Sequence, residues 1–381
     1  TIIALDGPDG EWQDFANWRD SQSDADPMVS HTREDICFQL YTSGTTGRPK
    51  GVMLPNACAF AGYVDGEPPD MSLAIGTWRE VFADDVSLCI APNFHLSGNG
   101  GIYNNISAGQ TVVIHPEFDV QKSVAAILDY KISKIFMVPA VLQILLEKAK
   151  QGADLSSIKL ISYGASPIPS ELMREAVEVI GCGFLQMYGM TEVGSSCTFL
   201  EPEDHSLTST ERMKSCGKAG DIFEMKIVDP VTKKDRPIGE SGEVAIKSPA
   251  PMQGYYKQPK ETAEVLQDGW YYSGDVGYVD AEGYFYIQDR LKDMIVSGGE
   301  NIYTAEVESA LFEHPAVREV AVFGVPSVRW GEEVKAVVAV EEGQSLSEDE
   351  LVGFARELIA GYKMPKSVDF IDALPRNGTG K

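Results

Sequence analysis

The chain has 381 residues, which is long enough for two or three domains of ordinary size. Its 57 Asp and Glu residues against 32 Lys and Arg residues give a formal net charge of −25, so a general electrostatic affinity for nucleic acid or an anionic membrane is disfavoured. With 23% charged and 43% hydrophobic residues, the composition is that of a folded protein and excludes general disorder.

Targeting and redox signals are absent from the sequence. No stretch stays apolar for the roughly 20 residues that a membrane-spanning helix needs, and the N-terminus has no basic flank or long apolar run. The six cysteines form no C-x-x-C pair, and the five histidines lack ligand spacing. These features predict a reduced, cytoplasmic protein without zinc. Position 1 is Thr instead of Met, which suggests a cut chain.

The first half of the chain predicts an α/β sheet. Residues 6–34 are polar and predict an irregular lead-in, and residues 36–41 predict a buried strand that runs into a loop over 42–51. From 86 to 190, apolar runs alternate with amphipathic segments, which is typical of a largely parallel sheet. The strands are expected at 86–91, 111–114, 134–138, 159–163 and 183–187. The helices are expected at 119–131, 140–150 and 170–180, with Ser170 as N-cap of the last.

The second half changes character twice. Between about 217 and 288 the helical patterns disappear, and turn signals such as Asp268-Gly269 separate short strands, which predicts an all-β module. Its strands are expected at 224–228, 242–247, 270–273 and 284–287. A small α+β domain then follows, with a helix starting at Thr304 and a capping box at Ser347 and Glu350. Its strands are expected at 319–325 and 333–340.

The first chemical signal is the loop Tyr41-Thr-Ser-Gly-Thr-Thr-Gly-Arg-Pro-Lys-Gly51. Its glycines let backbone N–H groups converge on an anion, its hydroxyl groups add donors, and Lys50 adds a positive charge, as in a phosphate cradle. It is not the P-loop of NTPases, because Pro49 stands where that motif has its second glycine. The alternative is a surface turn without a ligand. The residues assigned to phosphate binding are Thr42, Ser43, Gly44, Thr45, Thr46, Gly47 and Lys50.

Six motifs, in order along the chain, resemble those of the adenylate-forming superfamily of acyl-CoA synthetases, firefly luciferase and peptide-synthetase adenylation domains. After the phosphate loop come an adenylate-binding strand end, a ribose motif, a hinge, the loop behind it and a catalytic-lysine motif. These are Gln186-Met-Tyr-Gly-Met-Thr-Glu192, Tyr271-Tyr-Ser-Gly-Asp275, Asp289-Arg-Leu-Lys-Asp293, Ser297-Gly-Gly-Glu-Asn301 and Pro375-Arg-Asn-Gly-Thr-Gly-Lys381. The chain is most similar to the fatty-acyl-CoA ligases of this superfamily.

The chemistry of acid activation agrees with this resemblance. A carboxylate is a poor electrophile, and transfer of AMP from ATP converts it into a mixed anhydride with a good leaving group. That reaction needs cationic groups, a metal ion and a binding site for adenosine. The resemblance implies that Thr191 contacts the α-phosphate, Glu192 holds Mg²⁺ and Lys381 stabilises charge during adenylation. Outside the motifs, Glu192 would be a solvated loop carboxylate and Lys381 a mobile terminal charge.

The resemblance also implies the contacts of the nucleoside and of CoA. Tyr188 stacks on adenine beside Gly189 and Met190, and Asp275 and Arg290 bind the ribose hydroxyls. The remaining assignments are the adenine and acyl loop of Gly164, Ala165 and Ser166, the hinge at Lys292, and a passage for the CoA pantetheine arm at Gly298 and Gly299. The alternatives are a core tyrosine at Tyr188, a surface ion pair of Arg290 with Asp289, and a simple turn after residue 163.

Asn93-Phe-His-Leu-Ser-Gly98 resembles the family's gate at the entrance of the acyl site. Relatives that activate amino acids carry an Asp after the Phe to hold the substrate ammonium, whereas this chain has His95. The glycines at 98, 100 and 101 suggest an open wall. Both features favour an aliphatic acid without an amino group. The alternative for His95 is a hydrogen-bonded core histidine.

The expected fold is α/β, with layered sheets flanked by helices, a β-barrel-like subdomain and a small α+β C-terminal domain. The expected boundaries are a large domain over 1–289 (α/β over 36–190, β-rich over 217–288), a hinge at 290–292 and a small domain over 293–381. The resemblance implies that the large domain lacks an N-terminal segment, and that Thr304 replaces a more usual Pro.

The expected function is an ATP-dependent fatty-acyl-CoA ligase that uses Mg²⁺ and CoA and acts on a small-molecule acid. Homo-oligomers are compatible with the sequence. The first alternative is an acyl-AMP ligase that loads a carrier protein, although residues 286–292 show no insertion of the kind such ligases carry near the hinge. The second alternative is an inactive ligand-binding fragment.

Overall fold

The computed structural model describes residues 3–4, 13–25, 28–42, 49–59, 84–166, 168–207 and 211–375, in two compact units, Thr1–Asp35 and Ile36–Lys381. In the first unit, β1 (Ile3–Ala4) pairs with β2 (Gln13–Asp14) and α1 (Phe15–Asp20) follows. Asp14 caps this helix by accepting from the Asn17 backbone N–H at 2.9 Å. The expectation of a wholly irregular lead-in over 6–34 is therefore wrong.

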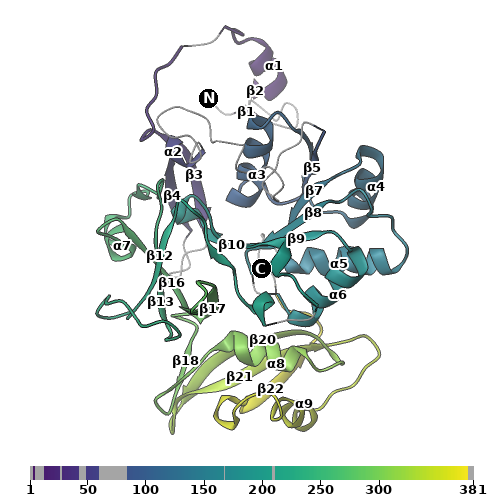
Figure 1. Cartoon of the computed structure of the whole chain (residues 1–381), viewed down its shortest axis with the longest axis vertical. Coiled ribbons are helices and arrows are strands. Elements are labelled where there is room, and N and C mark those ends of the chain that lie inside the picture. Colours follow the sequence, from purple (N-terminus) through teal and green to yellow (C-terminus); the bar gives the residue numbers. More distant parts are fainter. Residues whose placement is uncertain are drawn as a thin grey trace. The chain divides into compact units, whose positions relative to one another are not determined.

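A seven-stranded sheet forms the centre of the second unit, in the order β11-β10-β9-β8-β7-β5-β6 (Figure 1). The five strands β5 to β9 are parallel, as predicted, whereas β10 and β11 are antiparallel additions. The strands are β5 (Val86–Cys89), β6 (Thr111–Ile114), β7 (Lys134–Met137), β8 (Leu160–Gly164), β9 (Gly183–Met190), β10 (Ser195–Leu200) and β11 (Lys218–Ala219).

Helices flank this sheet. The three that the apolar spacing predicts are α4 (Val120–Tyr130), α5 (Pro139–Lys150) and α6 (Ser170–Ile180). They pack apolar faces on the strands, so Ile127, Leu142, Ile161, Tyr163 and Met173 form a core that is almost fully buried. Ser170 is not the N-cap of α6, because Pro169 occupies that position and Ser170 is the first helical residue. A fourth helix, α3 (Leu96–Ser107), was not expected, because its three glycines, at 98, 100 and 101, hide the helical pattern.

The expected all-β region forms an antiparallel sheet in the order β12-β13-β16-β15, with β17 paired to β16. Its strands are β12 (Glu224–Val228), β13 (Gly242–Lys247), β15 (Leu266–Gln267), β16 (Trp270–Val279) and β17 (Phe285–Arg290). The expectation that helices are absent here is wrong, because α7 (Pro259–Val265) precedes β15, with Pro in its first turn.

A three-stranded sheet joins the two halves of the sequence. β3 (Ile36–Thr42) and β4 (Lys50–Pro55) form a hairpin around the phosphate loop, and β14 (Gly254–Tyr255) adds to β4. The two ends of the predicted loop over 42–51 are therefore strand residues. Val52 and Leu54 are fully buried against Val244 and Ile246 of the β-rich sheet. The short helix α2 (Asn56–Ala59) follows β4.

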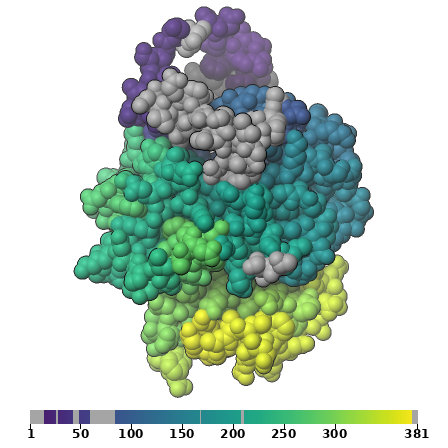
Figure 2. Space-filling model, in the orientation of Figure 1, coloured from purple at the N-terminus to yellow at the C-terminus, as the bar shows by residue number. Residues whose placement is uncertain are grey.

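The C-terminal residues form a separate sheet in the order β19-β18-β21-β20, with β22 parallel to β21. Its strands are β18 (Ile295–Ser297), β19 (Glu300–Ile302), β20 (Val317–Ser327), β21 (Gly331–Val340) and β22 (Ser367–Ile371). The helices α8 (Thr304–Phe312) and α9 (Glu348–Ala355) cover it, and Ser347 caps α9 as predicted. In Figure 2 these residues appear as a continuous packed body, light green to yellow. Their predicted boundary as a domain stays a prediction.

Candidate active site

Glu192 lies in a tight turn at the carboxyl end of the parallel strand β9. Thr191 and Glu192 are both buried, in a one-turn 3₁₀ helix (Thr191–Val193) between β9 and β10. The turn is held from the β-rich region, because the Met252 N–H donates to the Glu192 carbonyl at 2.8 Å and Ser248 Oγ donates to the Val193 carbonyl at 2.9 Å. Glu192 is thus not a solvated loop carboxylate. Its place beyond a strand end is where open parallel sheets bind ligands.

The two ends of the phosphate loop meet beside this carboxylate. Thr42 and Lys50 are opposite one another in the β3–β4 hairpin, and Thr42 Oγ1 donates to Glu192 Oε1 over a long 3.4 Å. Lys50 Nζ lies 4.6 Å from the centre of the Tyr255 ring, and Tyr255 Oη donates to Glu192 Oε1 at 3.0 Å. The loop residues Ser43, Gly44, Thr45, Thr46 and Gly47 lie outside the described residues.

Sequence reasoning missed Tyr255. It stands in a Gly-Tyr-Tyr run that carries no charge and no recognisable spacing, and its importance follows from the pairing of β14 with β4. A second omission is Glu243, which is buried on β13. Its carboxylate accepts from the Gly274 N–H at 3.1 Å and pairs with Lys233 at 2.5 Å, and so holds the predicted ribose motif in place.

Tyr188, Asp275 and Arg290 come together from three strands of two sheets. Asp275 on β16 is 2% exposed, accepts from Tyr188 Oη at 2.6 Å and pairs with Arg290 Nε at 2.7 Å. Burial and the nearby Asp275 charge raise the pKa of Tyr188, so its hydroxyl stays protonated and donates. A carboxylate has lone pairs for further donors, such as the two hydroxyls of a ribose.

Arg290 forms its ion pair with Asp275, and the alternative of a surface ion pair with Asp289 is wrong. Asp289 instead accepts from the backbone N–H and hydroxyl of Thr304, the first residue of α8. Thr304 therefore does not cap the helix with its own side chain, because Asp289 takes that role from the end of β17. Asp289 and Arg290 have different partners because residues that are adjacent in a strand point to opposite faces of the sheet.

The loop after β8 is shaped by its neighbouring strand. Gly164 is buried, and a Cβ placed on it would lie 2.1 Å from the Met187 carbonyl oxygen of β9, so only glycine fits. Ala165 has φ of +68°, and Ala165 and Ser166 are exposed beyond the strand end. Gly189 and Met190 lie on β9 opposite Ser196 and Ser195 of β10.

A buried pair of side chains supports the same strand end. His205 Nδ1 donates to the Glu201 carbonyl at 2.9 Å, so Nε2 accepts from the Tyr163 hydroxyl, also at 2.9 Å. Burial lowers the pKa of His205, which keeps the ring neutral. Tyr163 directly precedes Gly164, so its hydrogen bond to His205 holds the start of the loop in place.

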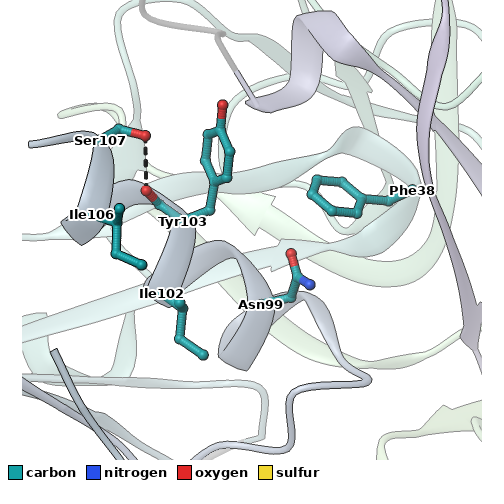
Figure 3. Close-up of a pocket in the computed structure, with 6 residues that line it drawn as sticks. All are labelled: Phe38, Asn99, Ile102, Tyr103, Ile106 and Ser107. Atoms are coloured by element: carbon teal, nitrogen blue, oxygen red, sulfur yellow. Dashed lines mark hydrogen bonds between the residues drawn. The ribbon is translucent and has the colours of Figure 1, made fainter. Parts of the chain in front are cut away.

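His95 caps the helix α3. Its Nδ1 accepts from the Ser97 N–H at 3.3 Å, so the neutral ring carries its proton on Nε2. The expected open wall of glycines is wrong for Gly98, which is buried with the Pro92 carbonyl 2.4 Å from where its Cβ would be. One face of α3 and Phe38 of β3 line an open, mainly apolar hollow of about 230 Å³ (Figure 3). Its lining residues are Phe38, Asn99, Ile102, Tyr103, Ile106 and Ser107.

The residues assigned to the hinge and to CoA lie in two turns of the C-terminal region. Lys292 is exposed in the turn after β17, and Gly298 and Gly299 form the turn between β18 and β19, with φ of +63° and +91°. Among the described residues, no hydrogen bond or ion pair joins these three to Glu192. Lys381 lies outside the described residues.

The donor set fits a magnesium ion that is shared with phosphates. In the described part of the chain, no three His, Cys, Asp or Glu side chains cluster as a metal site. Mg²⁺ in nucleotide enzymes is held by one or two carboxylates together with phosphate oxygens and water, and the buried Glu192 beside the phosphate loop provides such a carboxylate. None of the described helices is long and apolar enough to cross a membrane.

The chain belongs to the family of AMP-binding enzymes, within the adenylate-forming superfamily. The AMP-binding enzyme model matches residues 1–256, and the AMP-binding enzyme C-terminal domain model matches residues 306–381. The resemblance inferred from the motifs, and with it the α/β fold class, is thereby confirmed.

Two curated relatives and one solved structure illustrate the similarity. A feruloyl-CoA synthase from Amycolatopsis is 38% identical over 95% of this chain and 71% of its own length. A fatty acid–[acyl-carrier-protein] ligase, ScoC, from Streptomyces coeruleorubidus is 39% identical over 100% of this chain and 71% of its own length. The o-succinylbenzoate–CoA synthetase of Bacillus subtilis, solved with ATP and magnesium, superposes with a TM-score of 0.81 at 34% identity, over 94% of this chain and 71% of that one.

Proposed function

We propose that the protein is an ATP-dependent ligase that activates an aliphatic carboxylic acid as its acyl adenylate and transfers the acyl group to CoA. The observation that carries this proposal is the convergence of the phosphate-loop ends Thr42 and Lys50 on the buried carboxylate of Glu192. Three segments that are far apart in the sequence build this group, and it lies at the strand end of an AMP-binding fold.

The proposed reaction has two steps. A carboxylate oxygen of the acid attacks the α-phosphorus of ATP, and the bond to pyrophosphate breaks. The CoA thiolate then attacks the acyl carbon, AMP leaves and the thiol proton goes to solvent. Lys50 and Lys381 contribute positive charge toward the phosphates, Thr191 donates to the α-phosphate, and Asp275 with Arg290 holds the ribose. Mg²⁺ bound at Glu192 would neutralise phosphate charge.

Two features support an aliphatic acid. Position 95 is a histidine, so the gate has no carboxylate to hold a substrate ammonium. The open hollow between α3 and Phe38 is lined mainly by apolar side chains, including Ile102 and Ile106 on successive turns of α3 (Figure 3). The relatives name both an aromatic and a fatty acid, so the substrate panel has to contain both.

A carrier protein is the second candidate acceptor. The relative named as a fatty acid–[acyl-carrier-protein] ligase aligns along the whole of this chain. CoA is favoured because residues 286–292 run from β17 into the following turn without an insertion. The acceptor is decided by offering acyl adenylate, formed in place, to CoA and to a phosphopantetheinylated carrier protein in parallel.

The proposal is tested by ATP–pyrophosphate exchange with the 381-residue chain and dodecanoate, ferulate or single amino acids. We expect exchange with dodecanoate and a thioester once CoA is added. Asp275→Asn should raise the KM for ATP by about 10- to 100-fold, because it removes a charged partner of the ribose site. Asp204→Asn is the matched control, since Asp204 also accepts from a tyrosine, Tyr284, at 3.0 Å. Exchange driven only by amino acids, or no exchange with any acid, would refute the proposal.

A further inference from the structure

Tyr255 contacts both of the opposite charges of the candidate active site, Lys50 and Glu192. Its ring faces the Lys50 ammonium, 4.6 Å from the ring centre, and its hydroxyl donates to Glu192 Oε1 at 3.0 Å. In the described part of the chain, no ion pair joins Lys50 directly to Glu192. The aromatic ring is 5% exposed, so it contacts both groups in a space that is largely closed to water.

The backbone holds this ring firmly at the start of β4. β14 pairs with β4, with Tyr255 opposite Val52, and the Tyr256 N–H donates to the Gly51 carbonyl at 2.7 Å. The Tyr255 N–H donates to Thr262 Oγ1 on α7 at 2.9 Å. The pairing with β4 and the hydrogen bond to α7 therefore fix the position of the ring beside Lys50.

We infer that Tyr255 is a positioning residue that keeps Lys50 and Glu192 from neutralising each other, so that the ammonium is available for phosphate and the carboxylate for magnesium. This inference rests on the proposed function. The ring holds the cation through its negative face, and the hydroxyl holds the carboxylate through a hydrogen bond.

The physical reason is the strength of attraction between opposite charges in a buried site. Without the ring, a lysine and a glutamate that share an enclosed, poorly hydrated space would pair directly. Such a pair would have to break before ATP and metal could bind. Burial and the Glu192 charge both raise the pKa of Tyr255, so the hydroxyl remains a donor at neutral pH.

Two substitutions separate the roles of the ring and of the hydroxyl. Tyr255→Phe keeps the ring between the charges, and we expect the Mg²⁺ concentration for half-maximal exchange to rise by about 3- to 10-fold through loss of one hydrogen bond. Tyr255→Leu also removes the aromatic face, and we expect a rise of at least about 30-fold, because Lys50 then competes with the metal for Glu192. Tyr284→Phe, which loses a tyrosine–carboxylate hydrogen bond to Asp204 elsewhere, should change nothing.

A double variant distinguishes this role from a purely structural one. Adding Lys50→Met to Tyr255→Leu should lower the metal requirement again by about threefold or more, whereas Lys50→Met alone should raise the KM for ATP and leave the metal requirement within about twofold. Equal effects of Phe and Leu at position 255, or no recovery in the double variant, would overturn the inference.

Calorimetric titration of each variant with Mn²⁺ and ATP provides a readout that does not need turnover, and thermal unfolding shows that each variant is folded. If the unmodified chain binds Mn²⁺ and ATP but catalyses no exchange, the proposed function fails while the ordering of metal affinities still decides the role of Tyr255. If the affinities of the Phe and Leu variants equal that of the unmodified chain, the role of Tyr255 fails instead.

Discussion

At the scale of single residues, the side chains assigned to the nucleotide are already engaged by one another. Asp275 is held by Tyr188 and Arg290, and Glu192 by Tyr255 and Thr42. Such contacts fix the side chains before a substrate arrives, which lowers the cost of ordering them during binding. The polar side chains of the site are thus already paired, and a ligand can bind to them without rearranging them.

Glu308 on α8 is a carboxylate whose surroundings disfavour its charge. The pKa of Glu308 is raised to about 7, mainly because burial disfavours the charged carboxylate. The charges of Asp289 and Asp293 raise it further, whereas the Val322 N–H, which donates to Oε1 at 2.9 Å, lowers it. The folded state therefore binds this proton more tightly than the unfolded chain. The resulting stability is complete below the ordinary pKa of 4.5 and is lost as the pH rises toward 7.

We expect Glu308→Gln to remove this pH dependence. The amide keeps an oxygen that can accept from Val322, and it carries no charge to desolvate. The free energy of unfolding of the unmodified protein should fall relative to that of the variant between pH 4.5 and 7, and the variant should be the more stable at pH 8. Urea unfolding across this range measures the difference. Glu357→Gln, at an exposed position, controls for the loss of one charge; parallel profiles for the unmodified and Glu308→Gln proteins would contradict the prediction.

At the scale of elements, α3 shows how one residue type has opposite effects within a helix. Gly98 faces the Pro92 carbonyl, and its Cβ would lie 2.4 Å from that oxygen, whereas a Cβ on Gly101 would meet nothing within 4 Å. Gly98 is thus required by close packing, and Gly101 only weakens the helix. Both glycines lower the helix propensity of this segment, which is why its sequence does not predict the helix.

The same substitution at both positions should therefore have opposite effects. Gly98→Ala should destabilise the protein by about 1–3 kcal/mol, because the added carbon has no space and the backbone must shift. Gly101→Ala should stabilise it by up to about 1 kcal/mol, since alanine is the better helix former. Thermal or urea unfolding of the two variants checks this directly. A loss of stability of equal size in both would show that α3 does not pack as described.

At the scale of the whole molecule, the family resemblance divides the reaction between two regions of the chain. Lys381 is assigned to adenylation, and the turn at Gly298 and Gly299 to thioester formation. Gly299 has open space around it and a φ of +91°, so a side chain there is strained but projects into free space. A bulky residue would therefore fill the passage proposed for the pantetheine arm.

We expect the two half-reactions to be separable by mutation. Lys381→Ala should slow acyl-adenylate formation by about 100-fold or more, while thioester formation from supplied acyl adenylate continues. Gly299→Leu should show the reverse pattern. Gly343→Leu is the control for backbone strain, because Gly343 has a φ of +78° and open space in the same C-terminal region. Pyrophosphate exchange and thioester release measure the two steps; equal loss of both in both variants would contradict the division of labour.

What the sequence by itself determined about this protein is mostly local. Apolar runs and their spacing predicted the five parallel strands and helices α4 to α6, because burial on a sheet or along one helix face imposes a period of two or 3.6 residues. The order of six motifs identified the family, and residues that it indicated do lie together in two polar groups, Thr42 with Glu192 and Tyr188 with Asp275.

The tertiary structure alone decided how those groups are joined. Tyr255 and Glu192 are 63 positions apart and Thr42 and Glu192 are 150 apart, so no local pattern relates them. The same holds for Arg290, whose partner is Asp275 across the β16–β17 pair and not its neighbour Asp289. Gly164 was assigned to the ligand, yet the carbonyl of Met187 on the next strand is what excludes a side chain there. In each case the deciding contact joins segments that are separated in the chain, and such contacts are set by the pairing of strands and the packing of the whole core and not by the residues adjacent in the chain.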